Sequence, residues 1–197
     1  MKLSILAIFA IAVTALAGCG GIANASPPAS AGTAALQTAH AQDAAGAYCK
    51  QTGGEVEHRY PVYGSNSSNL LFLAGERNFC QYTSKKDGSR IHILLETLYT
   101  TKPSLAALAY ILKPASGSCN GNPASCYCSL LGGSDQFGGT SGAGGGWYEK
   151  NAIDQTLEAC IFPDMSSIDS WGLTYHAHGI IRGINLQKVM RYKYPGS

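Results

Sequence analysis

Seven cysteines carry most of the chemistry that this sequence can support, and their spacing separates them into two groups. Cys19 stands alone near the amino terminus, at the end of a Leu-Ala-Gly-Cys tetrapeptide. The other six are Cys49, Cys80, Cys119, Cys126, Cys128 and Cys160. A thiol can be acylated, bind a metal, act as a nucleophile or join another thiol in a disulfide. The cellular compartment and the elements that hold each cysteine decide among these chemistries.

The first residues predict export. Lys2 precedes an apolar run over residues 3–17, which is typical of a secretory signal and is short for a membrane-spanning helix of about 20 residues. The tetrapeptide that ends at Cys19 resembles the lipobox of bacterial lipoproteins, which implies acylation of the Cys19 sulfur and, after cleavage, of its amino group. In bacterial lipoproteins the residue after the acylated cysteine influences sorting between membranes, and Gly20 at this position resembles that of lipoproteins sent to the outer membrane. Cleavage after Ala25, behind a small-x-small sequence, is the alternative.

An oxidising compartment favours disulfides for the remaining six cysteines, because their number is even. Six cysteines allow fifteen connectivities. The rival interpretation is zinc bound by Cys119, Cys126, Cys128 and Cys160, but their spacings lack the two-residue knuckle that structural zinc sites favour. We therefore predict disulfides.

An internal repeat narrows the connectivity. Tyr48-Cys49 and Tyr127-Cys128 are each followed, after three residues, by a Gly-Gly pair. The next cysteine lies 31 positions beyond Cys49 and 32 positions beyond Cys128. Farther on, the repeat aligns Asp87, Ser89 and Ile91 with Asp164, Ser166 and Ile168. Two copies of one module predict the pairs Cys49–Cys80 and Cys128–Cys160, with Cys119–Cys126 as a local third.

The predicted fold class is α+β, with two small repeated, disulfide-stapled modules that each contain a short helix and an antiparallel β-hairpin or three-stranded sheet. In the second module, Asn122 is expected to cap a helix that has Pro123 at its first position. The β signals cover residues 55–59, 69–74, 79–83 and 90–95 in the first copy, and 157–162 and 168–176 in the second. Apolar residues at helical spacing predict a connecting helix over residues 103–112.

These elements define five segments. We predict a lipoprotein signal peptide over residues 1–18, an Ala/Ser/Pro-rich tether over 19–42, the first module over 43–101, a connecting helix and linker over 102–119, and the second module with a basic carboxy-terminal segment over 120–197. The formal net charge of +2 offers no argument for nucleic acid.

The second module resembles a small bacterial lipoprotein domain of unknown function that carries a haemolysin label. The resemblance rests on residues 122–128, Gly132-Gly133, Cys160 to Asp164 and the Asp169 to Trp171 segment. Met165 stands where the family has a turn glycine. The first copy keeps the Tyr-Cys, Gly-Gly and second Cys but lacks the Asn-Pro-Ala-Ser sequence and the Trp. The resemblance implies no established reaction.

Residues for catalysis are few. His176 and His178 would lie on one face of a strand, where they could bind a metal or act as a base, but surface residues are the favoured interpretation. Glu158, Asp164 and Asp169 could form an acid/base or calcium cluster, although turn aspartates more often cap backbone groups. The stretch 138–146 lacks the Lys-Ser/Thr of a phosphate loop and is predicted to be a mobile loop. We predict no catalytic residues, no metal and no cofactor.

Binding is the favoured function. Trp147 and Tyr148, beside the glycine-rich loop, are predicted to be an exposed contact pair. We expect a non-enzymatic, lipid-anchored protein of the bacterial cell envelope, in the outer membrane on its periplasmic or surface face, acting as a binding or structural module. Its expected partners are the membrane, through lipid on Cys19, and an envelope protein or glycan. The alternatives are an inhibitor of a hydrolase and a metal-dependent hydrolase that uses His176 and His178.

Overall fold

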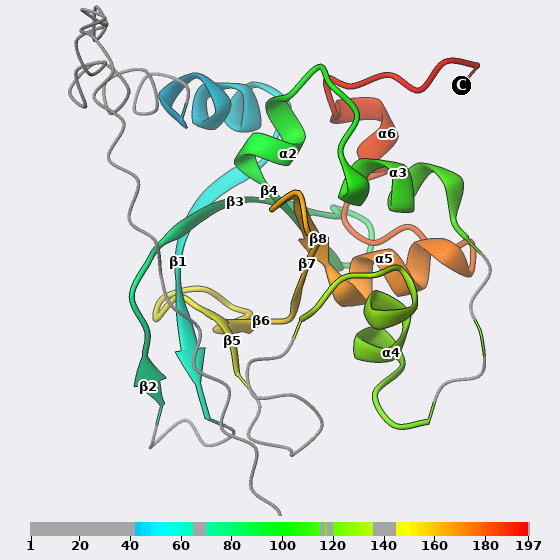
Figure 1. Cartoon of the computed structure of the whole chain (residues 1–197). Coiled ribbons are helices and arrows are strands. Elements are labelled where there is room, and N and C mark those ends of the chain that lie inside the picture. The colour runs from blue at the N-terminus through cyan, green and yellow to red at the C-terminus, as the bar shows by residue number, and fades with distance from the viewer. Residues whose placement is uncertain (1–41, 65–69, 115–116, 118–119, 136–144, 197) are drawn as a thin grey trace, which may run out of the picture.

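The computed structural model describes residues 42–64, 70–114, 117, 120–135 and 145–196. Within these residues the fold is α+β, with one antiparallel sheet of eight strands and helices on its outer side (Figure 1). The strands are β1 (Glu55–Tyr63), β2 (Leu71–Phe72), β3 (Arg77–Thr83), β4 (Arg90–Leu94), β5 (Gly145–Tyr148), β6 (Thr156–Leu157), β7 (Ala159–Ile161) and β8 (Ser167–Asp169). The helices are a first one over residues 42–51, α2 (Leu95–Tyr99), α3 (Leu105–Leu112), α4 (Pro123–Leu130), α5 (Ser170–Ala177) and α6 (Leu186–Val189).

The sheet curls into a nearly closed barrel. Its strand order is β6-β5-β1-β3-β4-β8-β7, and β2 pairs with β1 outside this path. The edge strands β6 and β7 are separated in the chain by Glu158 alone, so the backbone passes directly from one edge of the sheet to the other. Figure 1 shows the resulting ring of strands end-on. This closure creates a lumen that is separate from the core under the helices.

Alternation along the strands divides the buried side chains between these two spaces. Cys80, Ile93, Ile168 and Cys160 face outward and join the large core beneath the helices. The opposite face of the sheet contributes a smaller apolar cluster in the lumen, made of Phe79, Leu94, Trp147, Leu157 and Ala159. On the same face of β1, β3 and β4, the buried side chains of Glu57, Arg59, Gln81 and His92 are polar.

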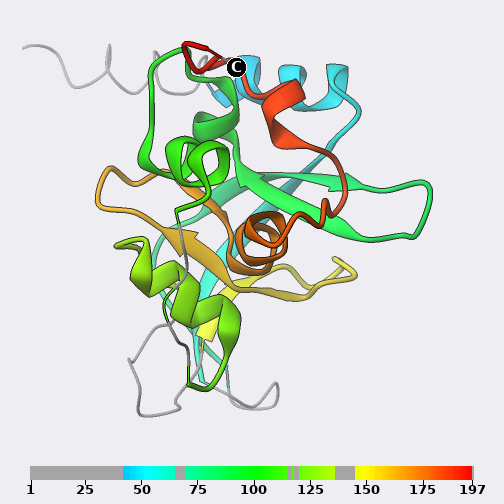
Figure 2. The same cartoon turned by 90° about the vertical axis from the view of Figure 1, so that its right-hand side faces the viewer.

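The helices pack on the outward face of β3, β4 and β8, and both long disulfides are buried there. Figure 2 shows α5 lying between α3 and α4. The predicted pairs Cys49–Cys80 and Cys128–Cys160 are both present, and all four cysteines are fully buried. Cys126 is also disulfide-bonded, while its predicted partner Cys119 and the lipidation candidate Cys19 lie outside the described residues. Each long bridge contributes about 3–4 kcal/mol in the chain-entropy treatment of disulfides.

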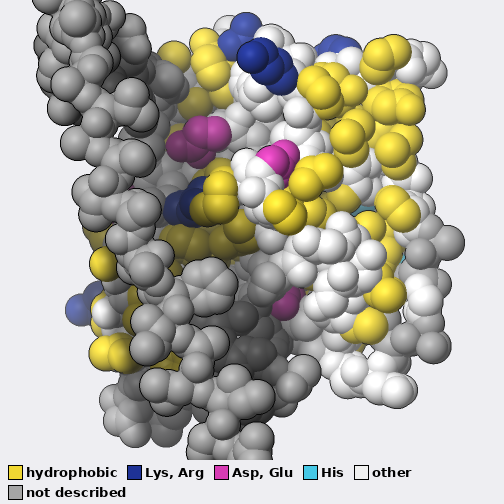
Figure 3. All heavy atoms as spheres, in the orientation of Figure 1, with side chains coloured by type: hydrophobic (Ala, Val, Ile, Leu, Met, Phe, Trp, Pro, Cys, Tyr) yellow, Lys and Arg dark blue, Asp and Glu magenta, His cyan; other side chains and the backbone are white. Residues whose placement is uncertain are grey.

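The outer surface of the helical layer keeps some apolar side chains. In the space-filling view, hydrophobic side chains gather on the side of the molecule where α3 and α6 lie (Figure 3). Leu105 and Leu112, at the two ends of α3, are exposed. Together with the exposed Leu130, they line a mainly apolar cavity of about 250 Å³.

The two halves of the chain share one sheet. Strand β4 of the first half pairs with β8 of the second through Ile93 and Ile168, and β1 pairs with β5. Across the four strands β3-β4-β8-β7, the row of paired residues is Cys80, Ile93, Ile168, Cys160. This row has the same order of residue types from either end. The residue after each Gly-Gly pair also pairs with the residue after the second cysteine, since Glu55 pairs with Gln81 and Ser134 with Ile161.

Local sequence patterns predict the first helix, α3 and α4 but miss α2, α5 and α6. Asn122 caps α4 and Pro123 occupies its first position, as predicted. The expected strand over residues 168–176 is wrong, because β8 ends at Asp169 and α5 follows at once. The physical reason is the Asp169 carboxylate, which accepts a hydrogen bond from the Gly172 N–H and caps the new helix. The predicted strand over residues 157–162 is divided at Glu158.

Candidate functional site

An ion pair fills the polar half of the barrel lumen. The Arg59 side chain is fully buried, and its Nε and Nη2 lie 2.8 and 2.7 Å from Glu57 Oε2. Its Nη1 donates to the backbone carbonyls of Trp147 and Asp154, at 2.9 Å in each case. Because these carbonyls belong to β5 and to the segment before β6, the guanidinium ties three parts of the barrel wall together.

His92 lies beside this ion pair and is held from both sides. Its Nε2 is 3.2 Å from Gln81 Oε1 and 3.5 Å from Glu57 Oε2, while its Nδ1 is 3.5 Å from Asp169 Oδ2. The His92 backbone N–H donates to the same Asp169 oxygen at 2.6 Å. The imidazole is therefore a fixed, buried group with oxygen atoms next to both ring nitrogens.

The polar end of the lumen opens to the surface as a cavity of about 250 Å³, here called the barrel mouth. The residues that line it are Arg90, His92, Asp154, Thr156, Leu157, Glu158, Asp169, Trp171 and Arg182. Arg90 donates two hydrogen bonds to the Asp154 carboxylate, from Nε to Oδ2 and from Nη2 to Oδ1, and the second distance is 2.8 Å. This hydrogen bonding lowers the pKa of Asp154 and raises the pKa of Arg90.

The barrel mouth presents donors, acceptors and one indole ring. Glu158 accepts from Asn122 Nδ2 at 3.2 Å, so this carboxylate is also held in place. The mouth of a β-barrel is a common place for a ligand, since concave surfaces with a few oriented polar groups fix its position. Among the described lining residues the only hydroxyl is that of Thr156. The arrangement favours recognition of a polar molecule.

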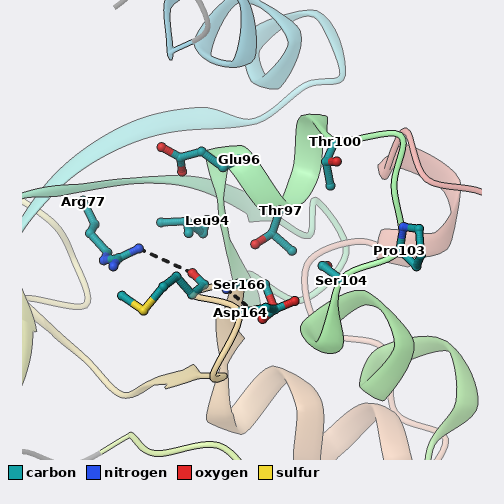
Figure 4. A pocket seen from close by; sticks show the side chains of 10 residues that line it. Arg77, Leu94, Glu96, Thr97, Thr100, Pro103, Ser104, Asp164 and Ser166 are labelled. Atoms are coloured by element: carbon teal, nitrogen blue, oxygen red, sulfur yellow. Dashed lines mark hydrogen bonds between the residues drawn. The ribbon is translucent and has the colours of Figure 1, made fainter. Parts of the chain in front are cut away.

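A second cavity, of about 380 Å³, lies at the start of α3 (Figure 4). Asp164 Oδ2 accepts from the Leu105 N–H at 2.8 Å, and Ser166 Oγ accepts from the Ala106 N–H at 3.0 Å. Burial acts to raise the pKa of Asp164, but the hydrogen bonds from Ser166 and from the Leu105 N–H outweigh it and lower the pKa. These side chains cap the start of α3. Such a capping role is the one expected of turn aspartates from the sequence.

The predicted contact pair Trp147-Tyr148 is not an exposed surface. Trp147 is 6% exposed and belongs to the lumen cluster, so this prediction is wrong. The physical reason is pairing, because β5 adds to β1 and turns the indole toward Phe79, with ring centroids 6.0 Å apart. Gly146 makes this approach feasible, since a Cβ there would lie 2.7 Å from the Leu157 carbonyl oxygen. Residues 138–144 of the glycine-rich stretch lie outside the described residues.

His176 and His178 do not share a face. His176 lies in the last turn of α5 and His178 is its C-cap, and residues two apart on a helix point in different directions. His176 is 3% exposed and stacks on Tyr110 with ring centroids 3.7 Å apart, whereas His178 Nδ1 lies 2.8 Å from the Thr174 carbonyl oxygen. The hypothesis of a metal-binding pair on one strand face is therefore wrong, and so is the favoured interpretation of His176 as a surface residue. Within the described ranges, no group of three or more His, Cys, Asp or Glu side chains is arranged to hold a metal ion.

Buried His176 should make stability depend on pH. Burial lowers its pKa from 6.5 to about 4, and the positive charge of Lys113 acts in the same direction. The unfolded chain then binds a proton between pH 6.5 and 4 that the folded chain does not, so stability falls as pH falls through this window. We expect this group to cost about 2–3 kcal/mol at pH 4 relative to pH 7.

The measurement is the free energy of unfolding by urea at several pH values, for the wild-type protein and for H176F. Phenylalanine keeps the stacking on Tyr110 and cannot titrate. The difference between the two proteins isolates His176 from every other titrating group. The two curves should separate progressively below pH 6.5, and curves that stay parallel down to pH 4 would contradict this account.

Comparison with protein-family models, with curated proteins and with solved structures finds no match for this chain. In the part of the chain that the structure describes, every helix falls short of the length and apolarity that a bilayer span requires. Sequence reasoning misses most of the residues that form the barrel mouth. Glu158 and Asp169 are expected as members of an acidic cluster, but Arg90, Asp154 and Arg182 are far apart in the sequence and come together only in the folded chain.

Proposed function

We propose that this protein is a non-enzymatic binding protein of the bacterial cell envelope, anchored by lipid on Cys19, with the barrel mouth as its binding site. The observation that carries the binding function is the mouth itself. Charged side chains from four separate segments converge there around a cavity, and hydrogen bonds hold four of them in place. Such preorganisation lowers the entropic cost of binding a small polar molecule.

The proposed anchor explains how such a protein would be retained at the membrane. The export signal and lipobox-like sequence precede a tether that leads to the first described residue, Gln42. Several acyl chains on one cysteine would give stable attachment, since a single chain binds only marginally. The residues from Met1 to Ala41 lie outside the described part, so this proposal rests on their sequence.

A duplication is also part of the proposal. It is supported by the palindromic row of Cys80, Ile93, Ile168 and Cys160 across four strands. A second support is the hairpin turn of each half, in which an aspartate Oδ1 accepts from the N–H and the hydroxyl of the serine two residues later. The residue between them has a positive φ, 71° at Gly88 and 64° at Met165.

The binding proposal is tested with the exported protein and soluble fragments of digested bacterial cell wall. Two-dimensional ¹H–¹⁵N spectra should show shifts for the Trp171 indole and for the backbone amides of Thr156 and Arg182. Mass spectrometry of the fragments before and after incubation should show no change. Shifts confined to residues far from the mouth would overturn the site, and a fragment whose mass changes would overturn the non-enzymatic assignment.

The anchor is tested on protein extracted from membranes. Its intact mass should exceed that of the chain from Cys19 to Ser197 by the mass of the acyl groups, and reduction should add two hydrogens for each disulfide. A mass that begins at Ser26, with no acyl group, would overturn the anchor and leave the binding proposal to be judged by the spectra.

A further inference from the structure

We infer that the barrel mouth binds the ring of a neutral hexopyranoside, an inference that rests on the proposed binding function and names its ligand class. Three features of the mouth carry it: an aromatic ledge on one side, carboxylates that already accept hydrogen bonds, and a size that matches one ring. The residues that line the mouth come from several segments of the chain, and all three features point to the same class of ligand.

The aromatic ledge is formed by α5. Trp171 lines the mouth, and Tyr175 lies one helical turn later, with ring centroids 5.9 Å apart and planes inclined by 33°. Tyr175 is 37% exposed, and the Arg182 guanidinium stacks 5.2 Å from the centre of its ring. A pyranose ring has a face of C–H groups, which packs on an aromatic surface, and a rim of hydroxyls, which need hydrogen-bonding partners. The aromatic ledge can therefore pack against the C–H face of a pyranose ring.

The charged groups suit the rim. Asp154 is held by two donors of Arg90, and Asp169 accepts from the backbone N–H groups of His92 and Gly172. Glu158 is held by Asn122. A carboxylate that already accepts hydrogen bonds can still accept one from a hydroxyl, but an ionic ligand gains less from it than from an unbonded carboxylate, and at Asp154 it would have to displace Arg90. The mouth therefore favours a neutral, hydroxyl-rich molecule over an ion.

The overall charge of the lining leads to the same conclusion. Three carboxylates, those of Asp154, Glu158 and Asp169, face two guanidiniums, those of Arg90 and Arg182. An anionic sugar meets an excess of negative charge, because Arg90 is committed to Asp154. A cationic amino sugar must compete with Arg90 and with backbone donors for carboxylates that are already satisfied. The Arg182 guanidinium, which has no carboxylate within 4.0 Å among the described residues, is available to a hydroxyl.

The size of the mouth limits the ligand. Its volume of about 250 Å³ lies below the roughly 300–1,000 Å³ of sites for drug-sized molecules. One six-membered ring fits this space, whereas a longer saccharide would extend outward across the ledge. The fixed imidazole of His92 closes the inner end of the cavity.

The test is a titration of the protein with N-acetylglucosamine, glucosamine and glucuronate, which are neutral, cationic and anionic near neutral pH. The readouts are the ¹H–¹⁵N signals of the Trp171 indole and of the Thr156 and Arg182 amides. We expect N-acetylglucosamine to bind with a dissociation constant of the order of 1 mM, at least about threefold tighter than either charged sugar. W171A should weaken binding about tenfold, and W171F should keep most of it.

Matched variants separate binding from folding. Y63A removes an exposed aromatic ring of β1 that does not line the mouth and should leave binding unchanged. An unchanged Trp147 indole signal in W171A shows that the lumen is still folded. Tighter binding of a charged sugar overturns the ligand class and leaves the binding function standing. If no sugar binds, the class fails, and the cell-wall titration then decides whether the binding function fails with it.

Discussion

Replacing Arg59 with methionine is expected to lower the free energy of unfolding by about 3–5 kcal/mol. Methionine keeps much of the buried volume but leaves the Glu57 carboxylate without its partner inside the barrel. The carbonyls of Trp147 and Asp154 also lose their donor. A buried charge with no partner cannot recover its lost hydration, and this penalty dominates the loss. Urea unfolding at pH 7 with intact disulfides measures it.

The double variant E57L/R59M is the matched control. It removes both charges, so it should recover a large part of the stability that R59M loses, because a buried ion pair replaced by apolar side chains often costs little. The recovered energy measures the coupling between the two residues. A loss below about 1 kcal/mol in R59M, or a double variant less stable than R59M, would contradict the proposed role of the ion pair.

The elements that are predicted correctly depend on interactions between residues close in the sequence or on a spacing that occurs twice, and the others depend on contacts between distant residues. Asn122-Pro123 predicts α4 because a cap and a first-turn proline act within a few residues. The pairs Cys49–Cys80 and Cys128–Cys160 can be predicted because the similar spacing of Tyr-Cys, Gly-Gly and the next cysteine in the two halves supplies long-range information. The helix α5 escapes prediction because Asp169 falls inside an expected strand, where its capping role does not show.

The candidate site depends on the pairing register of the β-strands, which cannot be predicted from the sequence. Glu57 and Arg59 alternate with exposed residues along β1, a pattern that predicts a strand but would normally place charged residues toward solvent. Barrel closure reverses this expectation, since the charged face of β1 points into the lumen while His58 and Tyr60 on its other face are exposed. The surface prediction for Trp147 fails for the same reason, because the residues before it in the chain are glycines and its neighbours in space are on β3 and β6.

The Gly-Gly pairs give the second large expected effect, since their two glycines serve different purposes. At Gly54, a Cβ would overlap Cys80 Sγ and lie 2.9 Å from Cys49 Sγ; at Gly133 it would overlap Cys160 Sγ and lie 3.0 Å from Cys128 Sγ. We expect G54A and G133A each to lower the free energy of unfolding by about 3 kcal/mol, because the added methyl group displaces a buried disulfide. Thermal and urea unfolding of the oxidised variants measure this loss.

The preceding glycine of each pair is the matched control. Gly53 and Gly132 have φ of 88° and 83°, and an added methyl group would meet no described atom within 4 Å, so G53A and G132A should cost about 1 kcal/mol through backbone strain alone. The sharper comparison places G54A in a C49A/C80A background. With both sulfurs removed, the Tyr82 ring still lies close, since its Cε1 would be 3.0 Å from the methyl group, but most of the penalty of G54A should disappear. A penalty that persists without the sulfurs would mean that Gly54 is required for another reason, and that the shared spacing of Gly-Gly and cysteine does not arise from packing on the disulfide.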